Sequence, residues 1–231
     1  MTAIPEAFEP PSLGKAWGLS LKHFPAFLTV ALVSAVVAGI GYGIFGVLWF
    51  VVSELLLHAS SDSSGLAMIT GYVVGGIGSL PILIVWSLLL VLFQAIPAIY
   101  FAKGEVVSVG RSFQLLMEKP WRYIFAGALF GVILNVGFNL CYVPGLVVAM
   151  IGPVFINKIF TTDQDIVGAL SSSFDAVYKS EHVWSFVFIQ LLVGTVALVA
   201  CSCSCFILAF LFIPASSFYI QNVAYRRGII S

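Results

Sequence analysis

The sequence predicts an all-α membrane protein with six transmembrane helices, built as three repeats of an interfacial amphipathic helix followed by a helical hairpin. Of the 231 residues, 61% are hydrophobic and 9% are charged, whereas soluble domains carry about 25% charged residues. Long apolar runs predict membrane helices, and these runs lack the alternation of a transmembrane β-barrel. We expect residues 1–231 to form a single membrane domain.

The repeat is predicted by a recurring spacing between an aromatic residue and a late proline. The matched pairs are Trp17 with Pro97, Phe113 with Pro153, and Phe174 with Pro214. The last two pairs are each 40 residues apart and the first is 80 apart. A fixed period is the signature of internal repetition, although apolar segments also match by chance. The repeat units are about 12–101, 108–160 and 169–225.

The first unit opens with an amphipathic helix at 12–23, where Ser12 is the predicted N-cap. Its basic face, with Lys15, Lys22 and His23, is predicted to lie against lipid headgroups. Two membrane helices follow, at 24–52 and 67–101. The first has small residues at every fourth position, a pattern that allows close helix packing. The second is roughly 50 Å long, so we expect it to tilt, to break near 78–81, or to project beyond the bilayer.

The other two units repeat this order with shorter connections. The second comprises an interfacial segment at 102–120, a membrane helix at 122–140, a tight turn at 141–145, and a helix that ends near 160. The third comprises an interfacial helix within 161–182 capped by Asp165, a membrane helix at 183–200, a turn at 201–205, and a helix that ends near 225. Six membrane spans result.

The basic residues predict the orientation of these spans. The ten Lys and Arg residues are Lys15, Lys22, Lys103, Arg111, Lys119, Arg122, Lys158, Lys179, Arg226 and Arg227. All ten fall on one side of the predicted membrane, and the three opposite loops contain none. The positive-inside rule therefore places both termini in the cytosol. The N-terminal residues 1–11 carry two glutamates and three prolines, so we expect a short extended tail rather than a signal peptide.

All four cysteines map to the outer ends of the hairpins. They are Cys141, Cys201, Cys203 and Cys205. Cysteine packs well as a small apolar residue at a crowded helix end. The alternatives are a disulfide in an oxidising compartment and a thiolate cluster for a soft metal such as Cu(I) or Zn.

Polar side chains within the predicted spans are the other candidates for a site. Asn135 and Asn139 share a helix face, and Gln94 lies in another span; together they form a candidate intramembrane polar site. Such residues, with Asn157 and Gln190, commonly hydrogen-bond between helices. The other interpretation is a transport pathway, but no ionisable residue lies in the middle of a predicted span, which argues against ion-coupled transport.

The sequence lacks the patterns that indicate enzymes or nucleic-acid binding. It contains no His-Glu-x-x-His, no Gly-x-Ser-x-Gly, no phosphate-binding loop and no paired carboxylates within a predicted span. We therefore expect a non-enzymatic protein without a cofactor. The formal net charge is zero, so nucleic acid is not an expected partner.

Two short segments resemble a known family. The sequence Ile-Val-Gly-Ala-Leu-Ser-Ser-Ser-Phe at 166–174 and the sequence Tyr-Val-Pro-Gly at 142–145, set among six spans and amphipathic linkers, resemble the membrane-domain family of glycerophosphoryl diester phosphodiesterase and related uncharacterised bacterial inner-membrane proteins. The resemblance covers most of the chain and implies a six-helix fold in the bacterial cytoplasmic membrane. It carries no activity across, because the catalytic phosphodiesterase domain is absent from these residues.

These observations favour a lipid-interacting or membrane-organising protein, with membrane lipids as its partners. One alternative is a small subunit of a larger membrane complex or a homo-oligomer, since the small-residue pattern and short polar loops suit close helix packing. The other is a carrier for an uncharged or lipid-like solute, which predicts a cavity lined by Gln94, Asn135 and Asn139.

Overall fold

The computed structural model describes residues 3–59, 93–104, 108–203 and 209–230, and every regular element within them is a helix. Three helical stretches are long and apolar enough to cross a bilayer. They are α5 (Pro120–Leu140), α6 (Tyr142–Thr161), and residues Val183–Ala200 of α8 (Val183–Cys203). The predicted all-α class is confirmed, and these three helices are compatible with a membrane protein.

Three short helices stand at the predicted interfacial positions. They are α1 (Leu13–Lys22), α4 (Val109–Glu118) and α7 (Ile166–Tyr178). Ser12, Ser108 and Asp165 cap them, each accepting a hydrogen bond from the backbone N–H three residues further on at 3.0 to 3.4 Å. An N-cap of this kind satisfies one of the unpaired N–H groups at a helix start. The predicted caps Ser12 and Asp165 are therefore confirmed.

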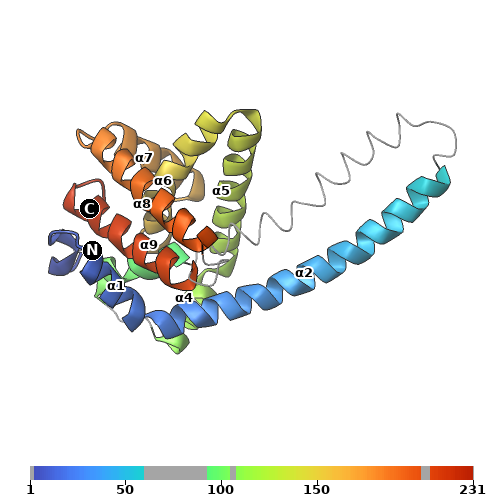
Figure 1. Cartoon of the computed structure of the whole chain (residues 1–231), viewed down its shortest axis with the longest axis horizontal. Helices are drawn as coiled ribbons and strands as arrows, with labels where there is room; N and C mark the ends of the chain where they lie inside the picture. The colour runs from blue at the N-terminus through green and yellow to red at the C-terminus, as the bar shows by residue number, and fades with distance from the viewer. Residues whose placement is uncertain (1–2, 60–92, 105–107, 204–208, 231) are drawn as a thin grey trace.

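The long helix α2 (Phe24–Ala59) extends away from the group formed by α5 to α9 (Ala209–Arg226) (Figure 1). It has 36 residues and is therefore roughly 54 Å long. It continues beyond the predicted end at Val52, because the Glu and Leu residues that follow favour a helix. Of the predicted helix at 67–101, residues 93–101 are helical; the predicted break near 78–81 lies outside the described residues.

The core lies between α6, α9 and the helical residues 93–103. Buried aromatic rings from these elements and from α2 and α8 fill it, namely Phe27, Phe101, Phe155, Phe186 and Phe218. Within the bundle, 61% of the α6 span is buried, against 33% of α5 and 11% of α8. The helix that comes second in the α5–α6 hairpin is thus the inner one, while α8 presents most of its apolar surface outward.

The α5–α6 hairpin is closed by a single residue, Cys141, between Leu140 and Tyr142. Two glycines permit this approach: a Cβ on Gly137 would lie 2.9 Å from the backbone of Gly145. The tight turn predicted at 141–145 is therefore confirmed in a tighter form. The turn predicted at 201–205 differs, because residues 201–203 complete α8; Ser and Cys at a helix end do not break a helix as Gly or Pro does.

Candidate functional site at the basic end of the bundle

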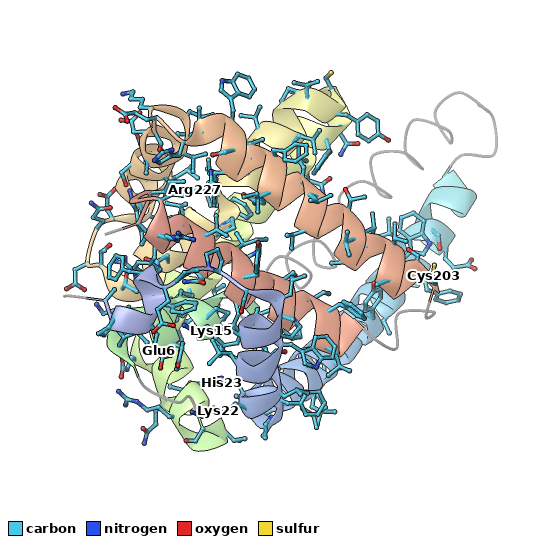
Figure 2. The ribbon with its side chains drawn as sticks, turned by 60° about the vertical axis from the view of Figure 1, so that its left-hand side comes forward. Glu6, Lys15, Lys22, His23, Cys203 and Arg227 are labelled. Carbon is cyan, nitrogen blue, oxygen red and sulfur yellow. The ribbon has the colours of Figure 1, made fainter. Side chains whose placement is uncertain are left out.

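Basic side chains gather at the end of the bundle where α5 and α8 begin and α6 and α9 end. Figure 2 shows Lys15, Lys22 and Arg227 on the same side of the molecule, with Cys203 at the far end of α8. Lys158 lies in the last turn of α6 and Arg226 in that of α9. This arrangement is the one that the charge pattern of the sequence predicts.

Two basic residues at the start of α5 form hydrogen bonds and an ion pair with the end of α6. Arg122 donates from Nε to the carbonyl oxygen of Ile159 at 3.3 Å and from Nη2 to that of Thr162 at 2.9 Å. A guanidinium there satisfies carbonyls that a helix end leaves unpaired and opposes the negative end of the helix dipole. Lys119 Nζ lies 2.6 Å from Asp163 Oδ1 and lowers the pKa of that carboxyl group.

A buried polar network joins α6 to α9. Asn157 Nδ2 donates to Gln221 Oε1 at 3.3 Å and to the Tyr225 hydroxyl oxygen at 3.0 Å. Gln221 Nε2 donates to the carbonyl oxygen of Pro153 at 2.8 Å. Asn157, Gln221 and Tyr225 are all buried. Their polar groups are shielded from water, so the hydrogen bonds between them satisfy groups that would otherwise be unpaired. The network holds the two helices together.

Gln190 of α8 serves α6 in a similar way. Pro153 has no N–H, so the carbonyl of Ala149 lacks the donor that an uninterrupted helix would give it. Gln190 Nε2 donates to this oxygen at 3.3 Å. The amide oxygen of Gln190 is buried with no hydrogen-bond partner among the described residues. The predicted role of Asn157 and Gln190 as interhelical hydrogen-bonding residues is thereby confirmed.

The N-terminal residues are docked on α9 and form a short helix, so the expectation of an extended tail is wrong. Residues Pro5–Phe8 form a short 3-10 helix, η1. Asn222 Nδ2 of α9 donates to the carbonyl oxygen of Ala7 at 2.7 Å, and Lys15 Nζ lies 2.7 Å from Glu9 Oε2. The prolines suit a tight turn as well as an extended chain, and the Asn222 amide decides between them. Both ends of the chain lie on this side of the molecule (Figure 1).

His23 does not face the headgroups as the sequence predicts; it is 1% exposed. Its ring lies 5.2 Å from the rings of Tyr100 and Phe218, measured between centroids. Nδ1 is 2.8 Å from the carbonyl oxygen of Leu19, so Nδ1 carries the proton and Nε2 is an acceptor, which has no partner among the described residues. Burial lowers the pKa of His23, so the neutral form is favoured.

A pocket of about 310 Å³ opens at the same end. It lies between the N-terminal segment, the connection from α7 to α8, and the final turns of α9. The residues that line it are Pro11, His182, Ile189, Val223, Arg226 and Arg227. Sequence reasoning placed both arginines on one side of the membrane but did not bring them together with His182. The sequence signal that could have linked these residues is that they all fall on the same predicted side of the membrane.

The predicted intramembrane residues lie elsewhere. Asn139 Nδ2 donates to Asn135, at 2.9 Å to both its Oδ1 and its carbonyl oxygen, so the two share a face as expected. Gln94 Oε1 is buried without a hydrogen-bond partner among the described residues. None of the three lines the pocket. A solute site made by Gln94, Asn135 and Asn139 stays a prediction.

Cys141 and Cys203 are exposed free thiols, whereas Cys205 and the side chain of Cys201 lie outside the described residues. Among the side chains that are described, no three of His, Cys, Asp or Glu gather as they would around a metal ion. No protein-family model, curated protein or solved structure matches the chain. The resemblance to the phosphodiesterase membrane-domain family therefore stays a prediction.

Proposed function

We propose that the chain is a non-enzymatic, six-span protein of the bacterial cytoplasmic membrane that binds and organises lipid at its cytosolic, basic end. The observation that carries this proposal is the meeting of short amphipathic helices and basic side chains at one end of an apolar bundle. Helices of that kind lie in the membrane interface, and basic residues attract the anionic lipids of the inner leaflet.

Helix α1 supports the proposal because one of its sides packs against the bundle and another exposes apolar residues. Ala16 and Ser20 are buried against α9, where the Trp17 ring lies 5.6 Å from that of Phe212. Leu13 and Leu21 are exposed, at 72% and 49%. Exposed leucines beside basic residues are suited to the boundary between acyl chains and headgroups.

Two exposed tryptophans support the placement of the basic end at the membrane–water interface. Trp121 stands at the start of α5 and Trp184 at the start of α8, both at the basic end, and they are 71% and 83% exposed. Tryptophan is enriched at membrane–water interfaces, where its ring lies among headgroups. The exposed apolar residues that follow along α5 and α8 would then contact acyl chains.

The order of elements supports three units and six spans. One short helix precedes each pair of longer ones: α1 before α2 and the helix that includes 93–103, α4 before α5 and α6, and α7 before α8 and α9. Pro153 and Pro214 both lie inside the second helix of their hairpins. This correspondence is what a repeat would produce.

The proposal is tested by the lipids that the full chain retains when it is extracted from native membranes in mild detergent. In one variant Leu13, Leu21 and the exposed Val167 of α7 are replaced by serine; in the matched control Leu140, Tyr142 and Val143, exposed at the other end, are replaced likewise. We expect mass spectrometry to show that the first variant loses retained lipid and the control does not. Equal retention by both would refute a lipid function for the basic end.

A further inference from the structure

We propose that the pocket lined by Arg226, Arg227 and His182 binds a phosphate group, and that its source in the membrane is the headgroup of an anionic phospholipid. This inference rests on the proposed lipid function and gives it a specific site. It depends on four properties of the pocket: its donors, the pairing of neighbouring acceptors, its electrostatic setting and its apolar walls.

The donors are two guanidinium groups that no other described side chain engages. Lys15, Lys119 and Lys179 at the same end each form an ion pair with a carboxylate at 2.6 to 2.9 Å. No ion pair or side-chain hydrogen bond joins Arg226 or Arg227 to another described residue. The planar fork of arginine matches phosphate oxygens in pairs, and the His182 imidazole adds a third side chain able to donate.

Several acceptors near these donors are already occupied. Helix α9 ends in a left-handed turn at Gly228, with φ of 65°, a conformation that glycine adopts without strain. The N–H groups of Arg227, Gly228 and Ile229 then bond to carbonyls of α9 at 3.0 to 3.1 Å. Glu9, the acidic residue closest in sequence to Pro11, is paired with Lys15. The exposed carboxylate of Glu181, which directly precedes His182, is outnumbered by the two arginines that line the pocket, so the pocket keeps a net positive charge.

The start of α8 adds to this charge. His182 directly precedes the 21 residues of α8, and its carbonyl oxygen accepts the N–H of Phe186 at 2.9 Å. The N-terminus of a helix carries a partial positive charge of about half an electron and offers free N–H groups. An anion beside His182 would therefore be stabilised by the helix as well as by the two arginines.

The remaining walls are apolar. Val223 is buried, and Ile189 and Pro11 are partly buried. A volume of about 310 Å³ is at the small end of the range for ligand sites, roughly 300–1,000 Å³. It is suited to a headgroup rather than to a whole lipid. Basic donors beside apolar walls at the membrane surface match an amphiphile better than a free inorganic anion.

The test compares lipid binding by the full chain and by two charge-matched double variants. Arg226→Gln with Arg227→Gln alters the pocket; Lys22→Gln with Arg111→Gln removes the same charge from residues that do not line it. Each purified protein is offered equal amounts of phosphatidylglycerol and phosphatidylcholine, and bound lipid is counted by native mass spectrometry. In a second arm, inorganic phosphate is given first without lipid and then as a competitor of the lipids. Unfolding temperature is compared for all proteins, and we expect it to be unchanged because both arginines are at the surface.

We expect the wild type and the control to prefer phosphatidylglycerol, and the pocket variant to lose that preference by about tenfold or more. Inorganic phosphate should compete only weakly. If phosphatidylglycerol binds equally to all three proteins, the pocket assignment is wrong while the lipid function stands. If phosphate binds the pocket and neither lipid does, the lipid source is wrong. If the wild type binds nothing, both proposals fail.

Discussion

At the scale of single residues, hydrogen bonds between helices decide how the apolar segments meet. Gln190 is informative because it supplies a hydrogen-bond donor that a proline removes from a neighbouring helix. Pro153 cannot donate a hydrogen bond to the carbonyl of Ala149, and Gln190 supplies a donor from α8. Interhelical hydrogen bonds in membranes are worth about 0.6 to 1.7 kcal/mol, so single exchanges here are measurable.

We expect Gln190→Leu to lower the free energy of unfolding by about 1 kcal/mol, because the Ala149 carbonyl is then left unpaired. In a Pro153→Ala background the restored N–H of residue 153 serves that carbonyl, so the same exchange should cost little. Unfolding of the detergent-solubilised chain measures the double-mutant cycle. Gln164→Leu, at an exposed position, is the control. Additive effects in the cycle would show that Gln190 does not compensate for the proline.

At the scale of elements, the hairpins depend on how closely their two helices approach. In the α5–α6 hairpin the backbone of Gly145 is next to Gly137. In α8, by contrast, a Cβ on Gly194 would meet nothing within 4 Å. The same substitution is therefore expected to have different consequences in two helices of equal length.

We expect Gly137→Ala to destabilise the chain by about 1–3 kcal/mol, since the added methyl group forces α5 and α6 apart. Gly194→Ala should be neutral or slightly stabilising, because alanine favours a helix over glycine by up to about 1 kcal/mol. Thermal unfolding in one detergent compares the two. Equal effects would mean that the close approach of α5 and α6 does not limit stability.

At the scale of the whole molecule, the basic side chains lie at one end and the thiols of Cys141 and Cys203 lie at the other. We expect a membrane-impermeant maleimide to label Cys141 and Cys203 in intact spheroplasts, because both thiols are exposed at the end that faces outward in the proposed orientation. In a variant with all four cysteines replaced by serine, Lys119→Cys and Lys179→Cys should be labelled only after permeabilisation. Labelling of either lysine position from outside would reverse the proposed orientation.

Sequence reasoning predicted local features well and distant ones poorly. The caps Ser12 and Asp165 act within three residues, so their chemistry is visible in the sequence. The polar network could be predicted only in part: Asn157 was identified as an interhelical residue, but Gln221 and Tyr225 lie 64 and 68 residues further on. Periodicity shows which face of a helix is buried and does not show which helix covers it. His23, the N-terminal segment and the pocket were missed for that reason.

The bond between Asn222 and Ala7 spans 215 positions of the chain. A ribosome that adds about 5–20 residues per second makes α9 roughly 10 to 40 s after η1. Until then the first residues have no site on which to dock, whereas the α5–α6 hairpin needs only its own neighbours. The hairpin can therefore form before the two ends of the chain meet. The wall that Pro11 gives to the pocket exists only after α9 is in place, so an unfinished chain has no such pocket.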